Sequence, residues 1–138
     1  MEVSYAFWNN KGGIGKTSLS FQAITRYAEK HPRKRILAID FCPQANLSEL
    51  LLGGIDRSSS EKIAFYQAQT PRCTIGGYVE MRLPPPFLPP RFKVHDFIVT
   101  PSEHNDSIPS NIDLVCGDPL LELQANAANS LANQTIPG

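Results

Sequence analysis

A short glycine-rich stretch early in the chain combines residue types that suit the binding of a phosphate group. Gly12, Gly13 and Gly15 permit positive φ, and in such a backbone successive N–H groups can point into one concave site. Lys16 adds a full positive charge, and the hydroxyl of Thr17 is a suitable ligand for Mg²⁺. These types and their spacing predict a site for a nucleotide phosphate and a divalent cation.

The segments on either side of this stretch predict the elements that hold it. Residues 3–8 form a β-branched and aromatic run that is typical of a buried strand. Residues 16–30 carry apolar side chains near helical spacing, and Pro32 is expected to end that helix. A helix that begins directly after a glycine loop adds its free N–H groups and the positive end of its dipole to an anion site.

A second strand is predicted over residues 33–40, which have a basic start, an apolar run and a closing Asp40. Strand, helix and strand then form a βαβ unit with a right-handed crossover. Ligands of such units bind at the carboxyl ends of the strands. We therefore expect the glycine-rich stretch and Asp40 at the same edge of the sheet.

The rest of the chain predicts more helices and one more strand. Helices are expected over residues 44–52, from Ser59 or Ser60 through the following apolar residues, and over residues 75–83 with Thr74 as the cap. Residues 111–117 predict a third strand, and Asp118 and Pro119 suit the start of a last helix. The pattern indicates an α/β fold with a narrow parallel sheet.

Residues 84–92 are proline-rich and are excluded from a regular helix or a central strand. We interpret residues 84–107 as a peripheral insertion, and a proline-rich recognition motif is the alternative. Residues 134–138 are expected to be a ragged end. The three histidines, His31, His95 and His104, are scattered and are predicted to face solvent without a metal or acid-base role.

Length and composition fit one domain over residues 1–138. The chain has 13 Lys and Arg and 13 Asp and Glu, so its zero net charge gives no overall preference for nucleic acid or anionic membranes. The three cysteines match neither a metal-binding pair nor a disulfide framework, which favours a reducing cytoplasm. No signal peptide or membrane span is evident, and no membrane partner is expected.

Residues 9–17, Asn-Asn-Lys-Gly-Gly-Ile-Gly-Lys-Thr, resemble the deviant Walker A motif of the ParA/MinD family of ATPases. The strict Walker pattern needs glycine at position 10, where this chain has Asn10, and the additional Lys11 matches the family. The resemblance implies a P-loop NTPase-type three-layer fold that binds ATP and Mg²⁺. It also implies that Lys11 reaches the phosphates of a partner subunit in a dimer. The implied nucleotide-binding residues are Lys11, Gly12, Gly13, Ile14, Gly15, Lys16, Thr17 and Ser18.

Residues 36–46 are similar to the second-strand motif of the same family. By this resemblance Asp40 lies near the Mg²⁺ and its waters, so Thr17 and Asp40 are the expected metal-site residues. Lys11, Lys16 and Asp40 are the expected catalytic residues. Cys42 departs from the family, because it occupies the place of a second aspartate that is expected to position the attacking water. A thiol is a poor substitute, which predicts slow hydrolysis or help from another group.

Residues 108–124 are similar to the strand and helix that precede the Walker B strand of the family. The Walker B strand itself is not found. Residues 95–105 look similar to it, but Asp96 precedes the apolar run instead of closing it, so no Walker B residue is assigned. We therefore expect the chain to be an N-terminal portion of the family's domain.

The function implied by the resemblance is that of a ParA-type partition or positioning ATPase in the cytoplasm. Its implied partners are a second copy in an ATP-dependent homodimer, a ParB-like centromere-binding protein, and non-specific DNA through a surface mostly absent from this chain. The MinD branch fits less well, because Pro43 and Gln44 match the ParA motif. The alternative is a truncated, non-hydrolysing module that binds nucleotide or a partner and regulates a full-length relative.

Overall fold

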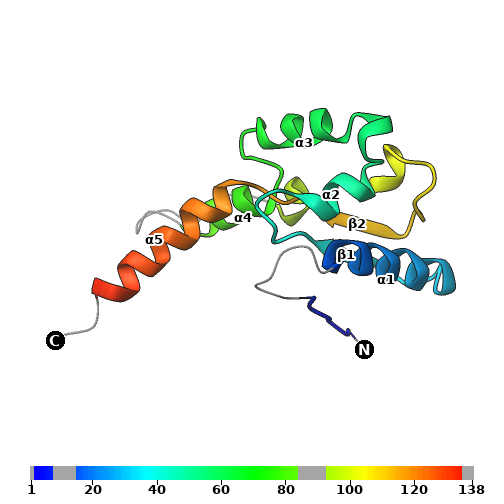
Figure 1. Cartoon of the computed structure of the whole chain (residues 1–138), viewed down its shortest axis with the longest axis horizontal. Helices are drawn as coiled ribbons and strands as arrows, with labels where there is room; N and C mark the ends of the chain where they lie inside the picture. The colour runs from blue at the N-terminus through cyan, green and yellow to red at the C-terminus, as the bar shows by residue number, and fades with distance from the viewer. Residues whose placement is uncertain (1, 8–14, 84–92, 135–138) are drawn as a thin grey trace.

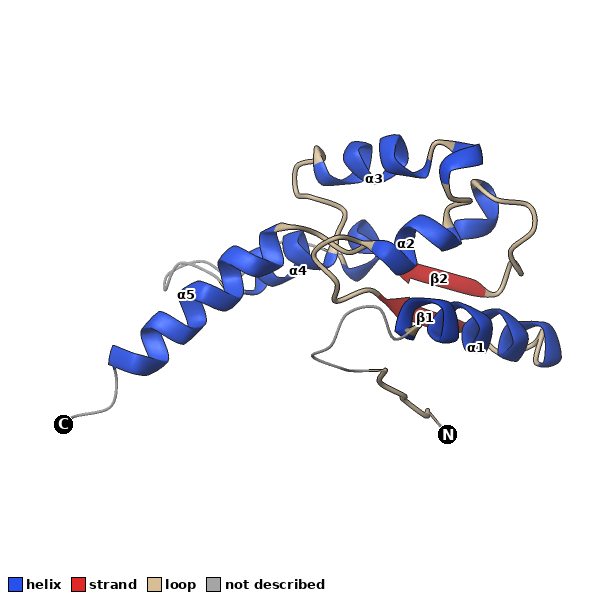
Figure 2. Ribbon diagram, viewed as in Figure 1, coloured by secondary structure: helices blue, strands red, loops and turns tan. Residues whose placement is uncertain are grey.

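The computed structural model describes residues 2–7, 15–83 and 93–134 of the 138-residue chain. In these residues, helices surround a small parallel sheet, and a long last helix extends away from it (Figures 1 and 2). The elements in chain order are α1 (Lys16–Lys30), β1 (Ile36–Ile39), α2 (Asn46–Leu51), the 3₁₀ turn η1 (Ile55–Arg57), α3 (Ser59–Gln67), α4 (Ile75–Arg82), the 3₁₀ turns η2 (Val94–Phe97) and η3 (Pro101–Glu103), β2 (Ile112–Val115) and α5 (Leu120–Gln134).

The sheet of the described residues is a parallel pair. β1 pairs with β2 in a register that runs from Ile36 opposite Ile112 to Ile39 opposite Val115. On the other side of β2, Val99 forms an isolated antiparallel bridge with Leu114. The predicted strands at 33–40 and 111–117 and their parallel relation are thereby confirmed, as is the α/β class.

The core lies where α1, α2 and α3 pack around the strand pair. Ala28 of α1, Leu51 of α2 and Ile63 of α3 are buried, as are Ile112 and Leu114 of β2. Complete burial of an aliphatic side chain of this size contributes about 1.5–3 kcal/mol. β2 is the more buried strand, because β1 leaves Leu37 and Ile39 about half exposed.

The predicted buried strand at residues 3–8 is wrong for the residues that the structure describes there. Residues 2–7 are not in a strand, and Val3 and Tyr5 are 62% and 83% exposed. A strand needs the edge of a neighbour to receive its backbone hydrogen bonds. In the described part of the chain the sheet contains β1 and β2 alone, so residues 2–7 pair with neither strand.

The structure also differs from the peripheral insertion predicted over residues 84–107, in the second half of that range. Residues 84–92 lie outside the described residues, so the proline-rich motif stays a prediction. Phe97 and Val99, however, are 1% and 5% exposed, and Val99 bonds to the central strand. Residues 97–101 therefore contribute to the core, whereas residues 93–96 are exposed.

The helix starts agree with the prediction in two of three places. The Thr74 hydroxyl accepts a hydrogen bond from the Gly77 N–H, and Asp118 accepts one from the Leu120 N–H. The expected cap at Ser59 or Ser60 is wrong, because α3 begins at Ser59 and Ser58 precedes it in the left-handed conformation. Helix α5 ends at Gln134, and the expected ragged end beyond it lies outside the described residues.

Candidate phosphate-binding site

The start of α1 has the features expected of an anion site. Gly15 caps the helix with φ 76° and ψ 12°, and a Cβ built there has no neighbour within 4 Å. Glycine is thus favoured by the left-handed backbone and not by a lack of space. The Gly15 carbonyl accepts the Leu19 N–H at 2.9 Å, which begins the helix. No acidic residue lies in the first turn, so the positive end of the helix dipole is not neutralised within α1.

The predicted binding residues that the structure describes follow Gly15 directly. Lys16 and Thr17 are half-buried in the first turn of α1, and Ser18 beside them is exposed. Lys11, Gly12, Gly13 and Ile14 lie outside the described residues, so their roles stay predictions. The structure therefore shows a helix N-terminus with a lysine and a threonine in its first turn, the arrangement expected for one side of a phosphate site.

Asp40 lies directly after β1 and is 4% exposed. Its Oδ1 accepts the Cys42 N–H at 3.0 Å, and its Oδ2 accepts the N–H and the hydroxyl of Ser48 at 2.9 and 2.8 Å. All three donors are neutral, and in the described part of the chain Asp40 forms no salt bridge. Asp40 is thus a buried carboxylate whose negative charge has no ion-pair partner among these residues.

Ser48 and Gly117 complete this arrangement and were missed by the sequence analysis. The Ser48 hydroxyl donates to Asp40 and accepts the Gly117 N–H at 3.0 Å, which joins the ends of β1 and β2. A Cβ at Gly117 would lie 2.4 Å from the Cys42 carbonyl oxygen and 2.8 Å from the Ala45 Cα. Only glycine permits this approach, and a glycine directly after an apolar strand is the pattern that could have indicated it.

Cys42 is half-buried on the loop between β1 and α2. Its thiol lies 3.5 Å from Gln44 Oε1 and 3.9 Å from Asn46 Nδ2. Gln44 and Asn46 belong to the sequence block in which Cys42 departs from the family pattern. The loop therefore surrounds the thiol with amide side chains.

The start of α1 and the end of β1 lie at the same edge of the sheet. Residues 31–35 turn the chain directly from the end of α1 into β1, so the helix runs back along the strand (Figure 1). Lys16, Thr17 and Asp40 consequently belong to one edge, as predicted. A carboxylate and a threonine hydroxyl at one edge are the oxygen ligands that Mg²⁺ prefers, since this ion is usually held by one or two protein oxygens together with phosphates and water.

Among the described residues, at this edge or elsewhere, no group of three or more His, Cys, Asp or Glu could hold a metal ion. His104 was expected to face solvent, which is wrong: it is half-buried, and its Nε2 lies 2.5 Å from the Tyr66 hydroxyl. Burial raises the pKa of Tyr66 to about 12 and also raises that of Cys116 to about 12. At neutral pH these buried groups are neutral and serve packing.

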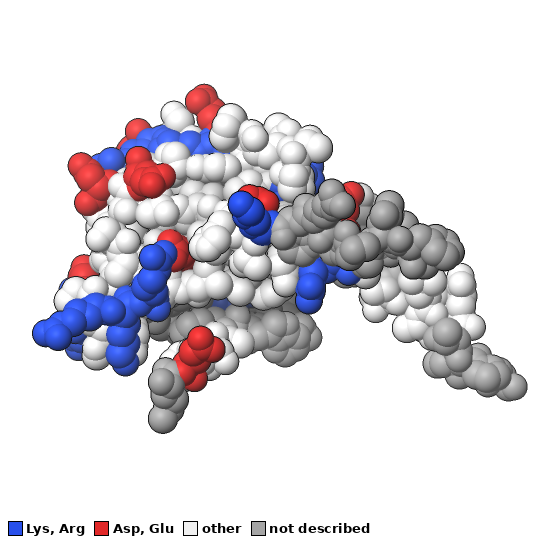
Figure 3. Space-filling model, turned by 180° about the vertical axis from the view of Figure 1, so that it is seen from behind, with Lys and Arg blue, Asp and Glu red and all other residues white. Residues whose placement is uncertain are grey.

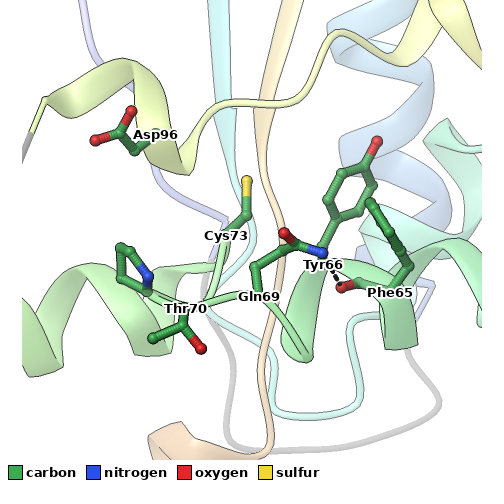
Figure 4. A pocket seen from close by; sticks show the side chains of 7 residues that line it. Phe65, Tyr66, Gln69, Thr70, Cys73 and Asp96 are labelled. Atoms are coloured by element: carbon green, nitrogen blue, oxygen red, sulfur yellow. Dashed lines mark hydrogen bonds between the residues drawn. The ribbon is translucent and has the colours of Figure 1, made fainter.

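A separate pocket of about 330 Å³ opens beside α3 and has Cys73 and Asp96 in its lining (Figure 4). Burial raises the pKa of the Cys73 thiol, so this thiol is a weak nucleophile. The described residues of this lining include no Lys or Arg. This pocket therefore lacks the cation that a phosphate site needs.

Comparison with known proteins gives one match, to a family model. The model described as an AAA domain matches residues 3–136. No curated protein and no solved structure gives a significant match. None of the described helices is both long enough and apolar enough to cross a membrane. The match covers nearly the whole chain and agrees with the parallel sheet and the glycine-capped helix. The chain therefore belongs to this AAA domain family, a ParA/MinD-like family of P-loop ATPases.

Proposed function

We propose that this chain binds ATP with Mg²⁺ at the edge formed by the start of α1 and the end of β1. The observation that carries the proposal is the placement of Lys16 and Thr17 in the first turn of α1, directly after left-handed Gly15. Helix N–H groups and Lys16 bind phosphate oxygens, and the Thr17 hydroxyl is a ligand for the metal. Asp40 orients the water molecules of the metal through its uncompensated charge.

The finer proposal is a ParA-type partition ATPase. The match to the family and the residues of the 9–17 and 36–46 blocks support it. In this proposal ATP favours a homodimer through Lys11, and a ParB-like protein and DNA are the partners. The location is the cytoplasm.

The test is a calorimetric titration of the chain with Mg-ATP, with Lys16→Ala as the variant. We expect heat of binding that Lys16→Ala abolishes, because about 4 kcal/mol of attraction between the ammonium and a phosphate is lost at an effective dielectric near 20. The matched control is Lys62→Ala, since Lys62 lies on α3 and bonds the carbonyls of Leu52 and His104. Equal binding by wild type and Lys16→Ala, with both folded by circular dichroism, would refute the proposed site.

The second candidate is a nucleotide-binding regulator that does not hydrolyse ATP. Cys42 favours it, because a half-buried thiol between amide side chains replaces the expected carboxylate. The two candidates differ in turnover and not in ATP binding.

A phosphate-release assay separates the two candidates. Turnover by wild type supports the ATPase, whereas ATP binding without turnover supports the regulator. Cys42→Asp restores the carboxylate of the family pattern and is expected to raise turnover, while Cys42→Ser, of similar size and without charge, is not. An increase with Cys42→Ser as large as that with Cys42→Asp would show that the carboxylate is not the cause.

A further inference from the structure

A concentration of positive charge at the far end of α1 has no role in the proposed phosphate site. Residues 26–35 contain five of the 13 Lys and Arg of the chain and a single acidic residue, Glu29. We call this segment, from the last turns of α1 to the start of β1, the basic turn. All five of its cationic residues are exposed: Arg26, Lys30, Arg33, Lys34 and Arg35. Figure 3 shows Lys and Arg side chains gathered at this end of the molecule, at the lower left.

Three of these cations, Lys30, Arg33 and Lys34, have no charged partner in the described part of the chain. Arg26 pairs with Glu29, and Arg35 pairs with Asp113 of β2. Lys30 and Arg33 form none of the salt bridges or side-chain hydrogen bonds found among the described residues. The charge of the basic turn is therefore only partly neutralised by the protein itself.

Aromatic contacts give the basic turn a defined shape. The Tyr27 ring packs against His31 with the ring centroids 4.3 Å apart. Lys34 Nζ lies 5.7 Å from the centre of the Tyr27 ring and 3.2 Å from its hydroxyl oxygen. Asn111 bonds the carbonyls of His31 and Lys34, and thereby ties the turn to the segment before β2. Such contacts reduce the entropy that the cations lose when a ligand orders them.

From this charge and shape we infer that the basic turn binds the phosphate backbone of a nucleic acid. Nucleic acids present closely spaced charges, about one per 1.7 Å of axis in a DNA duplex, which a compact set of cations can neutralise together. Arg26 and Lys30 are one helical turn apart and lie on the same face of α1. A membrane surface is a poorer fit, because residues 26–35 contain no Leu, Ile, Phe or Trp that could enter the lipid. Binding through these contacts is independent of base sequence.

This inference deepens the proposed function, because it assigns the proposed partner DNA to a specific surface, the basic turn. It rests on the proposed function only for the choice of DNA as the nucleic acid. The basic turn lies at the opposite end of α1 from Lys16, about 15 residues and roughly 20 Å along the helix. Nucleic-acid binding can thus be measured without nucleotide and in the Lys16→Ala variant. Loss of ATP binding and loss of nucleic-acid binding are then separate results.

The experiment is a fluorescence-anisotropy titration of the 138-residue chain with a labelled DNA duplex of random sequence at several salt concentrations. The variant Lys30→Gln/Arg33→Gln removes two of the three cations without a charged partner and leaves the Lys34–Tyr27 contact in place. We expect the affinity of this variant for DNA to fall roughly tenfold. The negative slope of log affinity against log salt should become shallower by about 2, because two phosphate contacts are lost. The control Arg57→Gln/Arg82→Gln removes the same charge from η1 and α4 and should leave both nearly unchanged.

Three further arms identify the ligand. Single-stranded RNA of the same length distinguishes the two sources of a phosphate backbone, and loss of binding by the variant with either one supports the inference. Absence of duplex and RNA binding, or equal loss with the control variant, overturns it. Equal competition by polyglutamate or by anionic vesicles overturns the assignment to nucleic acid.

Discussion

Two buried aspartates follow the two paired strands, and their surroundings differ in one respect. Asp40 follows β1 and accepts hydrogen bonds from neutral donors only. Asp118 lies three residues beyond β2 and is fully buried, and Arg72 donates to both of its oxygens, from Nε at 2.7 Å and from Nη2 at 2.6 Å. Thr74 adds a third hydrogen bond at 2.6 Å.

This difference separates a structural carboxylate from a candidate functional one. A buried charge is costly unless it is paired and hydrogen-bonded. Asp118 meets that condition within the protein, so it joins the start of α4 to the start of α5. Asp40 is hydrogen-bonded but lacks the cation. In the proposed function, this unpaired charge acts on the metal ion and its water molecules.

Two glycines of α4 lie against the Arg72–Asp118 ion pair. Gly76 and Gly77 reduce helix propensity, and the structure shows why they are present. A Cβ at Gly76 would lie 2.8 Å from Asp118 Oδ2, and a Cβ at Gly77 would lie 2.0 Å from the Arg72 carbonyl oxygen. Glycine allows the α4 backbone to approach the ion pair.

The largest expected effect comes from removing Arg72, the cationic partner of Asp118. Arg72→Met leaves a buried carboxylate without its ion pair, and we expect the free energy of unfolding to fall by about 3 kcal/mol. Urea denaturation measures it. The matched control is Arg26→Met, whose pair with Glu29 is exposed, and it should cost less than about 0.5 kcal/mol. Similar losses in both variants would contradict a structural role for the Asp118 pair.

The next effect reverses the usual preference of helices for alanine. Gly77→Ala places a methyl group against the Arg72 carbonyl, so we expect a loss of about 2 kcal/mol, although alanine normally gains about 1 kcal/mol over glycine in a helix. Thermal and urea unfolding give the value. Ala64→Gly at an exposed position of α3 is the reference and should cost about 1 kcal/mol. A stabilised Gly77→Ala would refute the close approach.

A smaller loss of stability is expected for Asp40→Asn, together with a loss of function. The amide NH₂ would face either the Cys42 N–H or the two Ser48 donors, which costs about 1–2 kcal/mol. Without the charge, we expect Mg²⁺ to increase ATP affinity less than in wild type. Titrations with and without Mg²⁺ measure this. Asp113→Asn on β2 is the control, and an equal change in both variants would remove Asp40 from the metal site.

The smallest effect appears only in acid. Burial raises the pKa of Asp118, but the hydrogen bonds from Arg72 and Thr74 outweigh it, so the net pKa lies below the ordinary value. A lowered pKa contributes stability that is complete above the unfolded value of about 4 and is lost as pH falls through the folded value. Denaturation between about pH 6 and 2 should show this acid loss in wild type and a smaller one in Asp118→Asn. Identical curves would indicate that Asp118 contributes nothing to acid sensitivity.

The candidate site could be predicted from sequence to the extent that it depends on local pattern. Gly15, Lys16 and Thr17 are adjacent in the chain, and their types and position before a helical pattern indicate the anion site directly. Ser48 and Gly117 could not be predicted, because they meet Asp40 only after β1 and β2 pair. The burial of Val99 likewise depends on its bridge to β2, and that of Phe97 on its contact with Tyr78 of α4.

The sequence by itself determined the helices, the two paired strands and the family, since periodicity, caps and motifs act over a few residues. The tertiary structure decided which charges are neutralised. Arg72 and Asp118 are 46 positions apart, and nothing in either segment indicates that they pair. It also decided that residues 2–7 lie exposed, because a strand requires a neighbour and no local pattern provides one.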